Sequence, residues 1–579
     1  MFLRKSLNRK TGRTQLFIVD AYWDPKEKKK KERIIRGLGY LDAWEQEYAD
    51  PIAHFKEVAR QMTEEKKKAE APVKLELNKQ EQLQLGTDNR RNFGYLACSK
   101  LYHELEINEF FNNRQKRTAA KYNLNAIFRA LVFSRIIAPD SKKGTYESLG
   151  KLFDKCDFSL DDIYRSLDIF SKYQSELQLF MHERLKKKYG RDTSLVYYDV
   201  TNYYFEIDDE DEMKRRGPSK EHRHDPIVQM GLFMDTNGLP INYGLFSGNT
   251  LDKQTLFPMM DRLSDDYDLG KIIIVADRGI ITGDNITQIR AEGNGYIFSY
   301  SIRGAMQSFK DYVLDEAGYR HTDEEDGFKI KSRIEEREIW VTNPVTGKKF
   351  RAKTLEKQVV FYSPSYAAKQ REERARVIEK AKDLIKNPSK YTKATGYGAA
   401  KYIDDIVFDR ESGEIVIKKG KALSLNEELI RDEAKFDGYY AIVTNEEEKT
   451  DKEILDIYRG LWKIEETFKI TKSGLSTRPI YLKTIGHVKA HFLICFTALL
   501  IMRLLEYRLK RKHSVQTIIE SLRRCECSLL ESNMYVFDYY DEVLQSVGTE
   551  LGIDFSRKYR SLKEIKNELG DTKKPAPLK

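Results

Sequence analysis

The sequence has little cysteine, no apolar leader and no apolar run long enough to cross a bilayer. Its 579 residues include five cysteines, too few and too scattered for a disulfide framework. No pair has zinc-site spacing, and we expect Cys525 and Cys527 to be thiols on a helix surface. The N-terminus shows no signal region, and the run from His491 to Met502 is too short and too interrupted for a membrane span. These absences predict a reduced, soluble, cytoplasmic protein that has no membrane partner.

Excess charge is also modest, at +10 for the whole chain, but it is unevenly distributed. The first 40 residues hold twelve Lys and Arg against four acidic residues, a net charge of +8. Such an arm suits a polyanion, because each neutralised phosphate releases condensed counterions. The alternative is an ordinary solvated charge run.

A chain of this length exceeds what one hydrophobic core usually supports, so we expect three or more structural parts. Residues 1–85 predict a basic β unit followed by a charged helical arm, with strands over 14–24 and 33–41 and a helix over 43–62. The apolar spacing predicts a helical domain over 91–190 and a C-terminal helical region over 511–579.

The pattern between the helical regions changes to β-rich runs. Residues 195–304 predict three strands, a helix, a strand, a helix and a strand, with a hairpin at Asn237-Gly238. This is the order of the first half of an RNase H-like α/β domain. Residues 305–445 predict a β-rich insertion domain, and a long helix beginning near Asp451 opens the second half of the core over 446–510. The predicted fold is therefore α/β: an RNase H-like core interrupted by a β-rich insertion, with a small N-terminal β unit and flanking helical regions.

Two aspartates lie at strand positions where an RNase H-like core usually carries its catalytic residues. Asp199 lies inside an apolar and aromatic strand, where a charge is expensive to bury without a partner or a metal. Asp277 ends a buried strand, at the carboxyl edge where α/β sheets usually place their sites. The alternative for each is a turn former or a salt bridge to a neighbour such as Arg278.

A glutamate on the predicted long helix is the third candidate. The apolar residues Ile454, Ile457, Leu461, Ile464 and Phe468 form the stripe that this helix buries. Tyr458, Glu465, Lys469 and Lys472 form a second line beside that stripe, whereas Glu466 is rotated about 100° away. The alternative is a solvated Glu–Lys pair four residues apart on a surface helix.

At these residues the chain resembles the bacterial insertion-sequence transposases of the DDE class that carry a Tyr-Arg-Glu-Lys signature. Tyr458, Glu465 and Lys472 have the family's spacing, and the runs around Asp199 and Asp277 resemble its two aspartate strands. The resemblance covers about 195–300 and 437–485, and more loosely the basic N-terminus. One departure is that Leu461 stands at the family's arginine position, and Arg459 lies about 160° round the helix from it.

The resemblance implies an enzyme that binds the terminal inverted repeats of its element, cuts at the element ends and joins the 3′ ends to target DNA. Asp199, Asp277 and Glu465 would be the catalytic residues and would hold two Mg²⁺ or Mn²⁺ ions, which are hard cations that prefer carboxylate oxygens. Paired-end cutting implies a homodimer in the synaptic complex, and the family implies a bacterial, nucleoid-associated protein. The residues expected to contact DNA are Tyr458, Arg459, Lys469, Lys472, Arg278 and Trp340.

Several alternatives remain open from the sequence. Tyr458 would either bond a terminal phosphate or pack in its helix. Trp340 would either stack on a base displaced from the DNA end or pack in the core of a separate β-rich lobe. Two rival functions are a catalytically silent DNA-binding relative and an RNase H-like nuclease that does not join strands.

Overall fold

Two units make up the chain, one from Met1 to Gly86 and one from Thr87 to Lys579. The computed structural model describes residues 1–7, 12–24, 29–70, 80–220, 224–267, 269–322, 325–392, 395–396, 398–408, 415–416 and 422–574. The lysine-rich loop predicted between the first strands falls largely outside the described residues.

The N-terminal unit is a three-stranded antiparallel sheet with one long helix. Its strands are β1 (Phe2–Leu7), β2 (Thr14–Asp24) and β3 (Lys29–Tyr40), and they are followed by α1 (Leu41–Trp44) and α2 (Pro51–Glu70). Leu16 and Ile18 of β2 alternate toward one face and pack with Leu38, Phe55 and Ala59. The unit therefore has its own small core.

Helix α2 begins at Pro51, so the prediction of one helix from residue 43 is wrong. The Asp50 side chain accepts a hydrogen bond of 2.9 Å from the Ala53 amide. Proline suits the first turn of a helix because it has no N–H to leave unpaired. The pair Asp50-Pro51 therefore starts a new helix.

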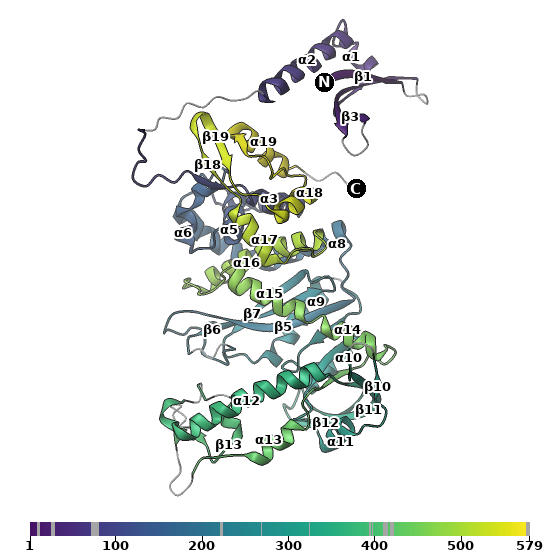
Figure 1. The fold of residues 1–579 in the computed structure, drawn as a ribbon, viewed down its shortest axis with the longest axis vertical. Helices are drawn as coiled ribbons and strands as arrows, with labels where there is room; N and C mark the ends of the chain where they lie inside the picture. The colour runs from purple at the N-terminus through teal and green to yellow at the C-terminus, as the bar shows by residue number, and fades with distance from the viewer. Residues whose placement is uncertain are drawn as a thin grey trace. The chain divides into compact units, whose positions relative to one another are not determined.

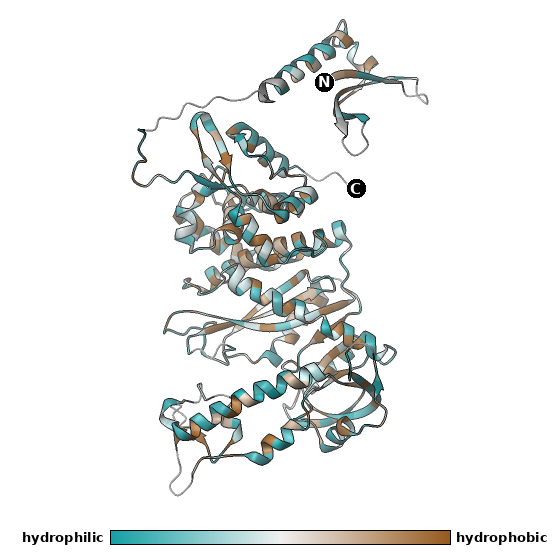
Figure 2. Ribbon diagram, viewed as in Figure 1, coloured by the Kyte–Doolittle hydropathy of each residue, from teal (hydrophilic) through white to brown (hydrophobic). Residues whose placement is uncertain are grey.

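The second unit begins with a helical part. Its elements are α3 (Tyr95–Glu104), α4 (Ile107–Gln115), α5 (Leu124–Ile137), α6 (Lys142–Glu147), η1 (Leu149–Lys151), α7 (Leu160–Lys172) and α8 (Gln174–Tyr189). Helix α16 (Ile485–Arg508), from late in the chain, packs against α3, α5 and α7 (Figure 1). Hydrophobic residues concentrate in this bundle (Figure 2).

The run from His491 to Met502 lies within helix α16, which is as a whole long and apolar enough, by length and composition, to cross a membrane. The helix has 24 residues and starts where the Thr484 side chain accepts a hydrogen bond from the His487 amide. Within its most apolar stretch, 94% is buried inside the protein. Its apolar residues thus form the core that joins the early and late parts of the unit.

The C-terminal region contains strands, so the prediction that it is helical throughout is wrong. Its elements are α17 (Val515–Arg524), β18 (Glu526–Leu529), η6 (Glu531–Asn533), β19 (Met534–Phe537), α18 (Glu542–Leu551), β20 (Tyr559–Ser561) and α19 (Leu562–Thr572). The strands form a sheet of order β20-β19-β18-β4, in which β4 (Arg90–Asn92) comes from far earlier in the chain. Cys525 ends α17 and Cys527 lies on β18. Both are buried in the hydrophobic core of this unit, so they are not helix-surface thiols.

A nine-stranded mixed sheet forms the centre of the second unit, in the order β10-β11-β12-β17-β9-β8-β5-β6-β7. The first five strands in sequence are β5 (Leu195–Tyr204), β6 (Ile227–Asp235), β7 (Pro240–Ser247), β8 (Ile273–Ala276) and β9 (Gly295–Tyr300). Strands β5, β6 and β7 are antiparallel, whereas β8 and β9 run parallel to β5. Helices α9 (Leu256–Asp266) and α10 (Gly283–Ala291) supply the crossovers. This arrangement is consistent with an RNase H-like fold, and it confirms the hairpin at Asn237-Gly238.

Strands of the predicted insertion extend this sheet, so the prediction of a separate lobe is wrong. Strand β17 pairs with β9 on one side and with β12 on the other. The region contains α11 (Gln307–Leu314), β10 (Arg320–His321), β11 (Lys329–Thr342), β12 (Lys349–Tyr362), α12 (Pro364–Lys386), η3 (Pro388–Lys390), η4 (Ala400–Tyr402), β13 (Ile403–Asp404), β14 (Val407–Phe408), β15 (Ile415–Val416), β16 (Ser424–Leu425), α13 (Glu427–Ala434) and β17 (Tyr439–Thr444). Helix α12 is mostly hydrophilic (Figure 2). The strands join the core because the edge of β9 offers unpaired backbone groups that β17 satisfies.

The predicted long helix is broken into α14 (Asp451–Arg459), α15 (Trp462–Lys469) and a π-helical turn, η5 (Ile470–Gly474). At the break the backbone bonds tighten to a three-residue spacing, as in Leu461 N–H to Tyr458 O at 3.0 Å and Ile464 N–H to Leu461 O at 3.1 Å. A Cβ on Gly460 would lie 1.9 Å from the Tyr197 hydroxyl. The close approach of β5 therefore requires glycine at the break.

Candidate active site

Asp199 and Asp277 lie at the same level on neighbouring parallel strands. Tyr197 of β5 is opposite Val275 of β8. When this pairing is continued for two more residues along both chains, Asp199 comes to lie beside Asp277. Ala276 is opposite Phe298 of β9, which sets Asp277 beside Ser299 in the same way. Neighbouring strands are about 4.8 Å apart, and residues in register point to the same face of a sheet. The sheet thus brings the two aspartates together.

Helices α14 and α15 cover the face that carries these carboxylates. The Tyr197 hydroxyl donates to the Ile457 carbonyl at 3.2 Å, and the Tyr203 hydroxyl lies 2.7 Å from that of Thr471. Side chains alternate along a strand, so Asp199, two residues after Tyr197, faces the same helices. The strand from 197 to 203 and the helical stretch from 457 to 471 each span about 20 Å, and they run in the same direction. Asp199 therefore lies under α15.

Glu465 projects from α15 and is exposed to solvent. Leu461, just before this helix, and Ile464 and Phe468 on it are buried, as the apolar stripe predicts, so Leu461 occupies core space at the position where the resemblance expects an arginine. No ion pair joins Glu465 to Lys469 among the described residues, so the alternative of a surface pair is not what the structure shows. Across the described ranges, no three His, Cys, Asp or Glu side chains lie close enough together to hold one metal ion. Glu465 is thus on the helix above the aspartates and is not gathered with them.

Burial and neighbouring charges set the electrostatics of Asp199. Its side chain is 21% exposed, and burial raises its pKa to about 6. The negative charges of Asp277 and Asp252 raise this pKa further, whereas the Lys220 ammonium and the Val200 amide lower it. Burial also raises the pKa of Asp252. A carboxylate beside other carboxylates, partly removed from water, is the environment that a divalent cation relieves.

Sequence reasoning missed Asp252 and Lys220. Asp252 opens the short helix η2 (Asp252–Gln254), and Lys220 lies in the connection between β5 and β6. Asp252 lies in the segment between Asp199 and Asp277 that resembles the corresponding segment of the family. No local sequence pattern distinguishes it from other acidic residues there. Lys220 has no signal at all in the sequence, because only the folded chain brings it to Asp199.

A chain of hydroxyl groups supports Asp277. The Ser299 hydroxyl donates to Asp277 Oδ1 at 2.6 Å. Nearby, the hydroxyls of Tyr440 and Tyr458 lie 2.6 Å apart. Burial raises the pKa of both tyrosines, and each also interacts with Ser299. The Tyr458 hydroxyl is thus engaged within the protein, which favours its packing role over a contact with a terminal phosphate.

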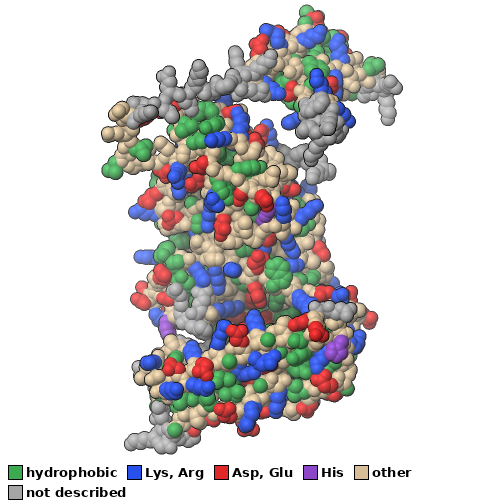
Figure 3. Space-filling view, in the orientation of Figure 1, with side chains coloured by type: hydrophobic (Ala, Val, Ile, Leu, Met, Phe, Trp, Pro, Cys, Tyr) green, Lys and Arg blue, Asp and Glu red, His purple; other side chains and the backbone are tan. Residues whose placement is uncertain are grey.

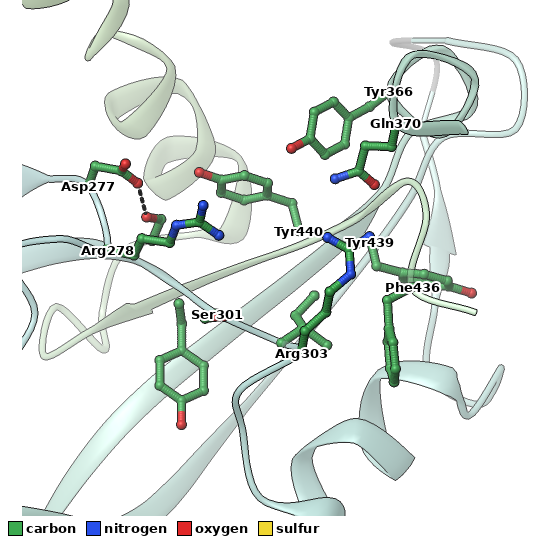
Figure 4. A pocket seen from close by; sticks show the side chains of 12 residues that line it. Asp277, Arg278, Ser301, Arg303, Tyr366, Gln370, Phe436, Tyr439 and Tyr440 are labelled. Carbon is green, nitrogen blue, oxygen red and sulfur yellow. Dashed lines mark hydrogen bonds between the residues drawn. The ribbon is translucent and has the colours of Figure 1, made fainter. Parts of the chain in front are cut away.

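A pocket of about 250 Å³ opens beside Asp277. Arg278 and Tyr440 turn toward it from the sheet side, and Tyr366 and Gln370 reach it from α12 (Figure 4). Arg278 makes no ion pair with Asp277 in the described structure, so the alternative of a simple salt bridge between them does not hold. The molecule is hollowed in this region, between the β5–β7 strands and α12, with acidic and basic side chains at the margin (Figure 3). Arg278 is therefore placed to meet an anion next to Asp277.

The remaining basic residues of the predicted site lie along the same helical stretch. Lys469 is exposed, and Lys472 is half-buried with its ammonium 5.8 Å from the Tyr203 ring centroid. The guanidinium of Arg459 lies 5.7 Å from the Phe328 ring centroid and pairs with Asp456 at 3.9 Å. Arg459 thus points toward the β11 side, away from Lys469 and Lys472.

Trp340 is 57% exposed, so the alternative that it packs in a lobe core is wrong. Its neighbours Ile339 and Val341 are buried, because alternate residues of β11 face the core. The Arg351 guanidinium covers the indole at 5.1 Å from its ring centroid. Trp340 lines a cavity of about 760 Å³ with Phe257 and Tyr300, and not the pocket beside Asp277. Tyr300 lines both cavities.

The donor set fits a divalent metal in its chemistry. Mg²⁺ is commonly held by one or two carboxylates, with waters and substrate phosphates completing its coordination. Asp199 and Asp277 provide two hard oxygen donors side by side, and the raised pKa of Asp199 shows that its negative charge lacks full compensation.

Comparison with known proteins agrees with this arrangement. A family model described as the transposase DDE domain matches residues 203–501, and the chain belongs to this family. The matched segment contains Asp277 and Glu465, and Asp199 lies just before it.

Other comparisons add little. No curated protein matches the chain. A crystal structure of the Mos1 mariner paired end complex with Mn is similar at 12% sequence identity and a TM-score of 0.13. That match covers 27% of this chain and 54% of the other, so this chain spans about half of the mariner chain.

Proposed function

We propose that this protein cleaves DNA at the ends of an insertion sequence and joins the freed 3′ ends to target DNA. The observation that carries the proposal is the register that sets Asp199 beside Asp277, under the helix that bears Glu465. Membership of the transposase DDE domain family supports the same reaction class. The bacterial insertion-sequence group with the Tyr-Arg-Glu-Lys signature is the proposed subgroup.

Asp199, Asp277 and Glu465 would hold two Mg²⁺ or Mn²⁺ ions. When bound, such ions supply an activated water or hydroxyl nucleophile and relieve charge at the leaving oxygen. Ser299 orients the Asp277 carboxylate through its 2.6 Å hydrogen bond. The exposure of Glu465 leaves its carboxylate able to turn toward the aspartates when phosphate and metal arrive, because no ion pair holds it elsewhere among the described residues.

DNA would run along the face of α15. Arg278 beside Asp277, and Lys469 and Lys472 beyond Glu465, would neutralise phosphates near the cut. Trp340, exposed on β11, would stack on a base displaced at the DNA end. The basic N-terminal unit would recognise the terminal inverted repeats, and two copies of the chain would pair the ends.

The test is a cleavage and joining assay with DNA from the ends of the element, identified as inverted repeats that flank the gene. Mg²⁺-dependent nicking at the repeat end, followed by joining of the 3′ end to a target plasmid, is the expected result. Nicking without joining would identify a nuclease on the same fold. Repeat binding without nicking in Mg²⁺ or Mn²⁺ would identify a catalytically silent relative.

A further inference from the structure

A lysine side chain lies between two carboxylates of the site. Lys220 Nζ is 3.8 Å from Asp199 Oδ1 and 4.0 Å from Asp252 Oδ2. The same ammonium donates a hydrogen bond to the Val200 carbonyl. One cation is thus surrounded by two carboxylates and a backbone oxygen, the donor type that hard cations also prefer.

Asp252 is held in this position by its own contacts. The Thr255 hydroxyl donates to the Asp252 carbonyl at 2.6 Å, and the Tyr198 hydroxyl donates to Thr255 at 2.7 Å. Tyr198 directly precedes Asp199 on β5, so the turn that carries Asp252 is fastened to the strand of the first aspartate. Asp252 Oδ2 would lie 3.9 Å from a Cβ on Gly279, two residues after Asp277. Asp252 therefore lies close enough to Asp199 for their charges to interact, and near the turn that follows Asp277.

The segment that carries Lys220 is anchored along the same strand. The Asn202 amide of β5 donates to the Pro218 carbonyl at 3.3 Å. Gly217 packs so closely that a Cβ there would lie 2.0 Å from the Gly248 carbonyl. The backbone is thus fixed near the site, while the Lys220 side chain itself is 44% exposed and has room to leave.

We propose that Lys220 is an internal counter-cation, which neutralises Asp199 and Asp252 while the site holds no divalent ion and gives up its place when such an ion binds. The proposal rests on the metal-dependent function proposed above. Without a cation between them, these carboxylates repel one another, because each is partly removed from water. An ammonium and a metal ion cannot both occupy the same carboxylate oxygens at contact distance. Lys220 therefore stabilises the metal-free protein and competes with the metal.

The test compares Lys220→Met with wild type in the absence of DNA. Binding of Mn²⁺ is measured by electron paramagnetic resonance of the free ion, and thermal unfolding is followed in chelator and in Mn²⁺. Lys220→Met is expected to bind Mn²⁺ roughly tenfold more tightly, because a unit positive charge about 4 Å from the site is removed. Its unfolding temperature is also expected to be lower than that of wild type in chelator. Addition of Mn²⁺ is expected to raise the unfolding temperature of the variant more than that of wild type.

Two control variants accompany it. Lys253→Met removes an exposed lysine beside Asp252 in sequence, with no ion pair described for it, and is expected to match wild type. Lys220→Arg keeps the charge and is expected to stay near wild type in both measurements. If Lys220→Met does not fold, Lys220→Gln replaces it, with the same expected tightening.

Unchanged or weaker Mn²⁺ binding by the neutral variants would overturn the role of Lys220. If the neutral variants fail in this way while wild type binds Mn²⁺ and Asp199→Asn does not, the lysine inference alone fails and the proposed function stands. If wild type and Asp199→Asn both fail to bind Mn²⁺, or bind it equally, the carboxylate site of the proposed function fails and the inference fails with it.

Discussion

The hydroxyl of Ser299 donates a hydrogen bond of 2.6 Å to the carboxylate of Asp277. Asp277 directly follows β8, and Ser299 lies on the adjacent parallel strand β9 one residue beyond the last paired position, so the bond follows from the sheet pairing. It fixes the rotamer of a carboxylate that is otherwise open to solvent.

Ser299→Ala is expected to slow strand cleavage about tenfold, because a hydrogen bond to a charged group is worth about 1.5–3 kcal/mol. DNA binding should be unchanged. The measurement is single-turnover cleavage of end DNA at saturating enzyme. Ser301→Ala is the matched control, since Ser301 also lines the pocket and has no bond to Asp277. Equal rates in the two variants would show that the Ser299 bond does not matter for the reaction.

The carboxylate substitutions test the site directly. Asp199→Asn, Asp277→Asn and Glu465→Gln are each expected to reduce cleavage at least a hundredfold and to leave binding to end DNA nearly intact, because amides keep the shape but lose the charge that holds metal. Glu466→Gln is the control for the helix, since Glu466 pairs with Arg503 at 3.1 Å and faces away from Glu465. A variant that cuts at a near wild-type rate in Mg²⁺ removes its residue from the site.

Stability in chelator should depend on pH through Asp199. Its pKa is raised from 3.8 to about 6 in the folded protein, so between pH 4 and 6 the folded state retains a proton that the unfolded chain loses. Stability contributed by this group is therefore present below about pH 4 and is lost as pH rises toward 6, by roughly 2 to 3 kcal/mol. Asp199→Asn should lack this loss. The measurement is the free energy of unfolding of both proteins, obtained by chemical denaturation across this pH range. Parallel plots of this free energy against pH would show that the pKa of Asp199 is not raised.

The N-terminal unit is expected to supply part of the affinity for DNA. Deletion of residues 1–40 would strip the sheet from Phe55 and Ala59 of α2, so removal of the whole unit, residues 1–86, is the cleaner change. The triple variant Lys30→Gln, Arg33→Gln and Arg36→Gln keeps the fold and should lower the slope of log affinity against log salt by up to about three if each side chain contacts a phosphate. An unchanged slope in both proteins would identify the basic arm as a solvated charge run.

Trp340→Ala is expected to weaken binding to end DNA about tenfold and to slow end cleavage, because stacking on one base is worth about 1–3 kcal/mol. The protein should remain folded, since the indole is 57% exposed. Phe350→Ala is the matched control, because Phe350 is 48% exposed and lies on the adjacent strand opposite Val341. If both variants bind and cleave as wild type does, the stacking role of Trp340 is wrong.

The sequence was sufficient to predict features that depend on local pattern. The apolar runs around Asp199 and before Asp277 predicted strands, and Asn237-Gly238 predicted the hairpin between β6 and β7. The 3-4 spacing of Ile464 and Phe468 predicted which face of α15 is buried.

Features that depend on distant contacts could not be predicted. The helical pattern runs on through residue 460, and only the Tyr197 hydroxyl beneath Gly460 shows why α14 ends there. Lys220 reaches Asp199 because its segment lies along β5, and β18 finds its partner β4 across most of the chain. None of these pairings leaves a periodic signal in the sequence.

A continuous ladder of backbone hydrogen bonds runs from β11 through β12, β17 and β9 to β8 and makes this part of the central sheet rigid. The surface of Trp340 and the carboxylate of Asp277 are both mounted on it, several strands apart. In the proposed function, DNA that contacts Trp340 would therefore meet Asp277 at a fixed distance, and that distance would set which phosphodiester bond is cut.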